Sequence, residues 1–121
     1  IMSSPTVHKS KLAEPHYTNV KSGAKPYETR VFDAKRRKVQ LGDIIEFAHN
    51  DVPKKPVIRV RVVELALFKN FRDAITSVGV RKVLPNVRTT DEGVKLYESF
   101  PDYKENAKIH GVVRWKLEVL K

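Results

Sequence analysis

Residues 22–32 read SGAKPYETRVF and predict, in this order, the end of a helix, a tight turn and a strand. Gly23 is typical of a helix end, because glycine adopts the left-handed backbone conformation there at little steric cost. A short helix is therefore expected over residues 16–22. The β-branched and aromatic residues that follow predict a strand over residues 25–32.

The predicted strand brings ionisable side chains together. Side chains two residues apart on a strand share a face, so Glu28 and Arg30 lie on one face, and Tyr27 and Thr29 on the other. Lys25 stands at the entrance to the strand. We expect Lys25, Glu28 and Arg30 to converge on one cleft, with the carboxylate between the two cations. Such a cleft can hold a phosphate or a base edge, whereas a solvated, ion-paired strand face is the alternative.

Short strands and short helices follow along the rest of the chain. Strands are expected at residues 8–13, 44–48, 57–68 and 112–120, helices at residues 71–78, 89–100 and 102–109, and irregular connections at 33–40, with room for one helical turn, and at 80–88. The apolar alternation changes face after Val62, which indicates a β-bulge or bend of the kind that closes a small barrel. The fold class is therefore α+β, a small barrel of about five strands with short flanking helices.

The last predicted strand shows the clearest alternation of apolar and polar residues. One face carries Val113, Trp115, Leu117 and Val119, and the other carries Arg114, Lys116 and Glu118. Because successive side chains on a strand point to opposite faces, the apolar set is expected to be buried in the barrel core.

Length and composition limit the classes of protein to which the chain can belong. The chain of 121 residues fits one domain, which we assign to residues 8–121 after a flexible N-terminal end at residues 1–7. No cysteine is present, so disulfides and thiolate metal sites are excluded, and the four histidines lack the spacing of metal ligands. No apolar run is long enough to span a bilayer. We expect an intracellular protein, cytoplasmic or nuclear, with a monomer favoured, without metal or cofactor and without contact to a membrane.

The chain carries a strong positive charge. Its 24 Lys and Arg residues against 14 Asp and Glu residues give a net charge of +10. Residues 1–38 contain nine basic and three acidic residues, a net charge of +6, and the densest run is Lys35-Arg36-Arg37-Lys38. Such a charge attracts polyanions. The predicted partner is RNA, another nucleic acid or a modified nucleoside, and a merely basic surface is the alternative.

A family resemblance rests on two consecutive motifs. The first is Gly23-x-Lys25-x-x-Glu28-x-Arg30, and the second joins Asp33 and the basic run to Leu41-Gly42-Asp43-x-Ile45-x-Phe47. Together with the closing strand after the Tyr103 helix, these motifs resemble the ASCH domain family over residues 8–120. The resemblance implies a PUA-like β-barrel with a cleft beside the strand of the first motif. It also implies a role in RNA binding or nucleic-acid processing.

The charge, the cleft and the resemblance lead to one principal hypothesis, an RNA or modified-nucleotide binding module. The candidate ligand-binding residues are Gly23, Lys25, Tyr27, Glu28, Arg30, Lys35, Arg36, Arg37 and Tyr103. Two other functions stay open, a small nucleoside-directed amidohydrolase or RNA-processing enzyme, and a protein-interaction domain. Some ASCH relatives hydrolyse acylated cytidine with a Lys, a Thr three residues later and a Glu from a helical region. Lys25 matches, but Glu28 stands where the Thr would be, so the catalytic residues stay unknown, with Lys25 and Glu28 as candidates.

Overall fold

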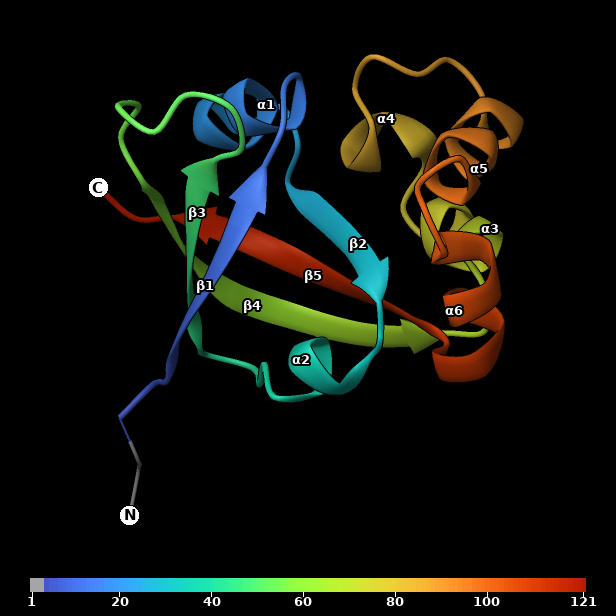
Figure 1. Cartoon of the computed structure of the whole chain (residues 1–121), viewed down its shortest axis with the longest axis horizontal. Helices are drawn as coiled ribbons and strands as arrows, with labels where there is room; N and C mark the ends of the chain where they lie inside the picture. The colour runs from blue at the N-terminus through green and yellow to red at the C-terminus, as the bar shows by residue number, and fades with distance from the viewer. Residues whose placement is uncertain (1–3) are drawn as a thin grey trace.

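The computed structural model describes residues 4–121, which form five strands and six short helices (Figure 1). The first three residues of the predicted flexible N-terminal end lie outside the described residues. The strands are β1 (Val7–Leu12), β2 (Tyr27–Val31), β3 (Ile44–His49), β4 (Ile58–Phe68) and β5 (Val112–Val119). The helices are α1 (His16–Ser22), α2 (Ala34–Arg37), α3 (Phe71–Thr76), α4 (Val80–Val83), α5 (Thr90–Glu98) and α6 (Tyr103–His110). Between residues 4 and 121, none of the helices has the length and apolar character needed to cross a membrane.

The five strands form one sheet in the order β1-β3-β4-β5-β2. β1 runs parallel to β3, and all other neighbouring strands are antiparallel. The sheet curls into a half-barrel whose two edges, β1 and β2, lie on either side of its open seam (Figure 1). β4 joins the two halves of the curl, and its register shift between Val62 and Glu64 is the predicted bulge. The predicted fold class, α+β with a small barrel of about five strands, is confirmed.

The inner face of the half-barrel holds the first of two hydrophobic clusters. Val113, Trp115 and Leu117 of β5 are buried in it, and the half-buried Val119 packs against them. α1 adds Tyr17 to the same cluster. The predicted core face of the last strand is therefore confirmed.

Helices α3–α6 gather against the other face of the sheet and enclose the second cluster (Figure 1). Phe71 of α3 and Tyr97 of α5 pack there with Val112 of β5. Arg114 lies on the predicted polar face of β5, yet it is only 8% exposed. The layer of helices covers this face, and the Arg114 guanidinium lies 4.9 Å from the centre of the Tyr27 ring.

Local signals account for most helix ends. Asn70 caps α3 and Thr89 caps α5, each accepting a backbone N–H with its side chain. Gly23 ends α1 with a φ of 85°, as predicted. Residues 80–83 form one turn of helix, α4, where an irregular connection was expected. Four residues are too few to show the apolar period by which a helix is recognised in a sequence.

Hydrogen bonds around Asp43 join the N-terminal segment to the turn before β3. The Asp43 carboxylate accepts the backbone N–H groups of Thr6 and Gln40, and it lies 2.8 Å from His8 Nε2. Gly42 precedes it with a φ of 90°, a backbone conformation that residues with a side chain rarely adopt. The Gly42-Asp43 pair of the second motif is therefore structural, because it holds the start of β1 beside the start of β3.

Candidate ligand-binding site

Two charged side chains, Lys25 and Glu28, are buried beside strand β2, and a third, Arg30, is half-buried there. Glu28 lies between two cations, with its Oε1 3.4 Å from Lys25 Nζ and its Oε2 3.2 Å from Arg30 Nη2. Oε1 also accepts the backbone N–H of Thr29 at 3.0 Å. Lys25 is 1% exposed, and its Nζ also donates to the carbonyl oxygen of Val83 on α4. The structure thus brings the three predicted residues together, with the carboxylate in the predicted central position.

The charges of this network keep the carboxylate ionised. Burial raises the pKa of a carboxyl, but the positive charges of Lys25 and Arg30 outweigh it and lower the pKa of Glu28 to about 2. Burial also lowers the pKa of Lys25, and the charge of Glu28 opposes that shift. For Arg30, burial acts to lower the pKa, but attraction to Glu28 prevails and the pKa is raised. The network therefore presents a guanidinium that stays charged.

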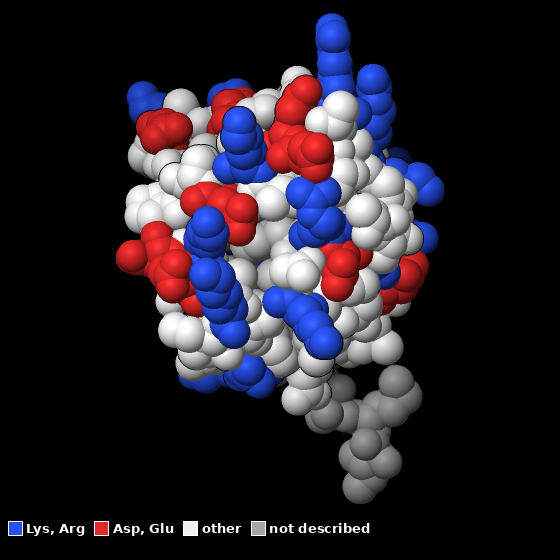
Figure 2. Space-filling view, turned by 90° about the vertical axis from the view of Figure 1, so that its right-hand side faces the viewer, with Lys and Arg blue, Asp and Glu red and all other residues white. Residues whose placement is uncertain are grey.

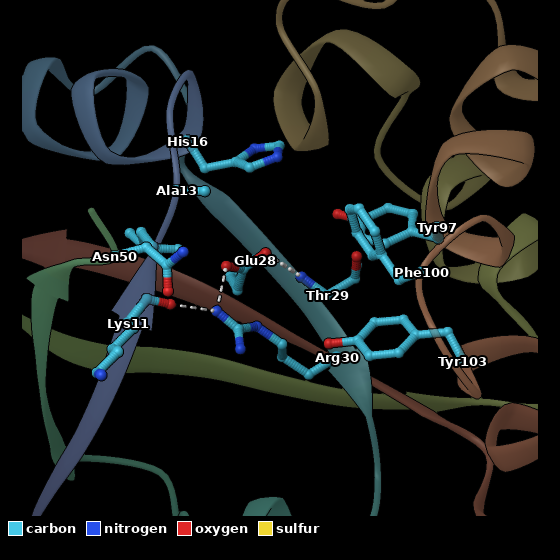
Figure 3. A pocket seen from close by; sticks show the side chains of 11 residues that line it. Lys11, Ala13, His16, Glu28, Thr29, Arg30, Asn50, Tyr97, Phe100 and Tyr103 are labelled. Atoms are coloured by element: carbon cyan, nitrogen blue, oxygen red, sulfur yellow. Dashed lines mark hydrogen bonds and ion pairs between the residues drawn. The ribbon is translucent and has the colours of Figure 1, made fainter.

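Arg30 links this network to the opposite edge of the sheet. Its Nη2 donates both to Glu28 Oε2 and, at 3.1 Å, to the carbonyl oxygen of Lys11 on β1. The N–H groups of Nη1 and Nε make no hydrogen bond to any residue between 4 and 121. Figure 3 shows the second terminal nitrogen of Arg30 directed away from Glu28. A guanidinium anchored in this way can still donate charge-assisted hydrogen bonds from its free Nη1 to a phosphate or carbonyl oxygen.

A cavity of about 320 Å³, the aromatic pocket, opens at the seam between the two edges of the sheet (Figure 3). Its lining consists of Lys11, Leu12, Ala13, His16, Glu28, Thr29, Arg30, Asn50, Tyr97, Phe100 and Tyr103. β2 lies between two walls, one from β1 and the start of α1, and one from α5 and α6. The volume lies at the small end of the range for small-molecule sites.

The wall from α5 and α6 consists of aromatic rings. Tyr97 and Tyr103 are both nearly parallel to Phe71, with ring centres 4.6 Å and 5.9 Å from it. Phe100 stands at nearly a right angle to both tyrosines. The rings are thus held by one another, and they give the pocket a surface on which a planar group can stack.

Two hydroxyl groups at the back of the aromatic pocket lack a partner. Thr29 Oγ1 and the Tyr97 hydroxyl are buried and close to each other, and neither makes a hydrogen bond of ordinary geometry within residues 4–121. Figure 3 shows the two side chains beside each other, between β2 and α5. Burial, with the negative charge of Glu28, raises the pKa of Tyr97, so its hydroxyl stays protonated. Buried polar groups without partners are uncommon in native proteins, and each needs a physical explanation.

A second hollow, the cationic groove, has a volume of about 670 Å³. Its lining consists of Lys9, Ser10, Lys11, Arg30, Lys35, Arg36, Glu46, Ala48, Asn50 and Val57. Lys11, Arg30 and Asn50 line both hollows, so the groove continues the aromatic pocket along the seam.

Solved structures of known proteins match this chain over nearly its whole length. The hypothetical protein PH0355 has 33% identical residues and a TM-score of 0.83, over 95% of this chain and 100% of PH0355. Protein PF0455 from Pyrococcus furiosus has 32% identical residues and a TM-score of 0.76, over 96% of this chain and 99% of PF0455. The ASCH protein from Zymomonas mobilis has the same fold, with a TM-score of 0.64 at 12% identity, over 93% of this chain and 67% of that protein.

The chain has an ASCH-like fold. PH0355 and PF0455 are its relatives by sequence, whereas the Zymomonas mobilis protein shows the shared fold. No model of a known protein family matches the sequence, and no curated protein does either.

Within this ASCH-like fold, the predicted ligand-binding residues occupy different places. Glu28, Arg30 and Tyr103 line the aromatic pocket, and Lys35 and Arg36 line the cationic groove. The remaining predicted residues lie outside the linings of both hollows: Gly23, Lys25, Tyr27 and Arg37.

Each residue outside the two linings has a structural partner or position. Gly23 ends α1, and Lys25 is enclosed behind Glu28. Tyr27 faces the helices on the far side of β2. The Arg37 guanidinium lies 4.4 Å from the centre of the Phe32 ring. Within the basic run, Lys35 and Arg36 therefore line the groove, whereas Arg37 packs on Phe32.

Sequence reasoning missed several residues of the aromatic pocket, among them Lys11, Asn50 and Phe100. Lys11 and Asn50 reach the site only through the parallel pairing of β1 with β3, which no local pattern reveals. Thr29 lies on the opposite strand face from Glu28, as predicted, yet it lines the same pocket because β2 is an edge strand. In the described part of the chain, no three His, Cys, Asp or Glu side chains are grouped to hold a metal ion.

Proposed function

We propose that this ASCH-like protein binds RNA or a modified nucleotide by taking a nucleobase into the aromatic pocket. The observation that carries the proposal is the state of Arg30. Its guanidinium is anchored by Glu28 and by the Lys11 carbonyl, while its Nη1 and Nε remain available. Because these two hydrogen bonds fix the guanidinium in place, it is preorganised to bind an acceptor group such as a base carbonyl or a phosphate.

The other walls of the pocket complement a nucleobase. Tyr103 and Phe100 provide ring surface for stacking, and stacking tolerates any base because every base has a π-face. The unpartnered hydroxyls of Thr29 and Tyr97 offer hydrogen bonds at the back of the pocket. The net charge of +10 favours encounter with an anionic ligand.

The geometry gives less support to the two alternatives. For the hydrolase, Lys25 does not line the pocket, and both carboxylate oxygens of Glu28 are already engaged. For a partner protein with an acidic surface, one broad basic face would be expected. On the face that α3–α6 present, basic and acidic side chains are interspersed (Figure 2).

A titration with two arginine variants tests the proposal. Nucleosides, acylated cytidine and a short single-stranded RNA are titrated into the wild type, Arg30→Lys and Arg72→Lys. Arg72 is the matched control, because it is an exposed arginine that pairs with Asp91 at 2.8 Å and lines neither hollow.

We expect Arg30→Lys to weaken binding by roughly 10- to 100-fold, because an ammonium cannot keep the bonds to Glu28 and the Lys11 carbonyl and also donate to the ligand in the geometry of the planar guanidinium. Arg72→Lys should leave affinity unchanged. Equal affinities of all three proteins for every ligand, or no binding at all, would refute the proposal. Release of the acyl group from acylated cytidine would instead establish the hydrolase.

A further inference from the structure

The aromatic pocket and the cationic groove form one continuous path along the seam. Lys11, Arg30 and Asn50 belong to the lining of both hollows. Arg30 stands at the junction, with Nη2 committed to Glu28 and Lys11 and with Nη1 and Nε uncommitted. A ligand that fills the pocket therefore has a ready continuation past this guanidinium into the groove.

The charge of the groove is strongly one-sided. Its lining holds five basic residues, Lys9, Lys11, Arg30, Lys35 and Arg36, and one acidic residue, Glu46. Glu46 is paired with Arg59 at 3.3 Å. Lys9, Lys11 and Lys35 form no salt bridge with any residue from 4 to 121. Three uncompensated lysines in a hollow favour a ligand with several negative charges.

The cations lie on both sides of the groove. Lys9 and Lys11 are two residues apart on β1, so they share the exposed face of this edge strand. Lys35 belongs to α2, which follows the other edge strand. A chain of phosphates along the groove would thus meet lysines from both edges of the sheet.

The aromatic pocket and the cationic groove differ in chemistry as the bases and the phosphates of a nucleotide chain differ. The aromatic pocket offers ring stacking and hydroxyls, which suit a base, and the groove offers ammonium groups, which suit phosphates. A base can enter a closed pocket only after it leaves its stack, which costs least in a single strand.

We infer that the ligand is a single-stranded nucleic acid, with one unstacked base in the aromatic pocket and its neighbouring phosphates along the cationic groove. This inference rests on the proposed function and extends it from a nucleotide to a strand. Arg30 binds the phosphate at the junction, and Lys9, Lys11 and Lys35 bind those beyond it.

Fluorescence anisotropy at several salt concentrations tests the inference. The probes are an eight-nucleotide RNA of mixed sequence, the DNA of the same sequence, the corresponding duplexes and the nucleoside monophosphates. The groove variant carries Lys11→Ala and Lys35→Ala. Its charge-matched control carries Lys69→Ala and Lys82→Ala, two exposed lysines that line neither hollow.

A single strand should bind at least tenfold more tightly than a monophosphate, and the duplex should bind less tightly than the single strand. The slope of log affinity against log salt should fall by about 1.4 in the groove variant, since each lost phosphate contact on a single strand contributes roughly 0.7. The control should keep the wild-type slope. A preference for the RNA over the DNA strand would add that the 2′-hydroxyl is recognised.

Three results would overturn the inference and leave the proposed function standing. The first is that a monophosphate binds as tightly as the single strand, and the second is that the duplex binds more tightly than the single strand. The third is that the groove variant and its control have equal slopes of log affinity against log salt. The absence of binding to every probe would reject the proposed function itself.

Discussion

The guanidinium of Arg30, on one edge strand of the half-barrel, donates a 3.1 Å hydrogen bond to the carbonyl oxygen of Lys11, on the other edge strand. This bond crosses the seam where backbone pairing between β1 and β2 is lacking in residues 4–121. Arg30 therefore joins the two edges of the sheet, in addition to facing both hollows.

This bridge predicts that Arg30→Met lowers the free energy of unfolding. The variant loses two hydrogen bonds of a charged donor, and the expected loss is about 1–3 kcal/mol. Urea unfolding measures it, with Arg72→Met as the control, since an exposed ion pair contributes at most about 1 kcal/mol. Equal stability of the two variants would mean that the seam needs no bridge.

Glu28 predicts a specific acid dependence of stability. Its pKa is about 2 in the folded protein and roughly 4.3 in an unfolded chain, so the unfolded state binds its proton first as the pH falls. The stability contributed by its ionised form is complete above pH ~4.3 and is lost as the pH falls toward 2. Its magnitude is on the order of 3 kcal/mol.

Glu28→Gln removes this titration, and other carboxyls titrate equally in both proteins. The difference in unfolding free energy between the wild type and Glu28→Gln should therefore shrink between pH 5 and pH 2. Denaturant titrations at four pH values in that range measure the difference. A constant difference would show that the carboxylate is not held by the cations beside it.

The unpartnered hydroxyl of Tyr97 predicts opposite effects on stability and on binding. Tyr97→Phe should keep or slightly raise the stability of the free protein, because a buried hydroxyl without a partner costs about 1–3 kcal/mol. It should weaken ligand binding by roughly fivefold, the equivalent of one hydrogen bond. Tyr17→Phe is the control, because the buried Tyr17 hydroxyl donates to the Pro56 carbonyl and its loss should destabilise the protein. A Tyr97→Phe protein as unstable as Tyr17→Phe would indicate that Tyr97 already has a partner.

The burial of Trp115 predicts how much the inner core contributes to the free energy of unfolding. It is 4% exposed on the inner face of β5, so Trp115→Ala should lower the unfolding free energy by about 3–5 kcal/mol. Glu118→Ala, an exposed change on the same strand, should stay within about 0.5 kcal/mol of the wild type. If Trp115→Ala and Glu118→Ala unfolded at the same urea concentration, the assignment of Trp115 to the inner face of β5 would be wrong.

The features predicted correctly from the sequence are those encoded over a few consecutive residues. The alternation around Trp115 identified the inner face, and the two-residue spacing identified the Glu28–Arg30 pair. The burial of Arg114 was not foreseen, because a single strand does not reveal that helices distant in the sequence cover its second face.

In the candidate site, too, residues close together in the sequence were predicted, and residues brought together only by the tertiary structure were not. Arg30 was predicted, whereas Lys11 and Asn50 depend on the order of strands in the sheet, and Tyr97 depends on the packing of α5 against Phe71 of α3. Glu28 was expected to lie in the ligand cleft, between two cations. Its burial between two cations makes it a structural residue as well.

The unclosed sheet has a consequence for how this protein meets other copies of itself. An edge strand exposes backbone N–H and C=O groups that can recruit a foreign strand, which is a common route to aggregation. Here both edges border one narrow opening, and the side chains of Arg30, Asn50 and Tyr103 line it. A foreign strand would have to displace an ion-paired arginine and an aromatic wall before pairing. The same side chains that create room for a small ligand therefore guard the edges against intermolecular β-pairing.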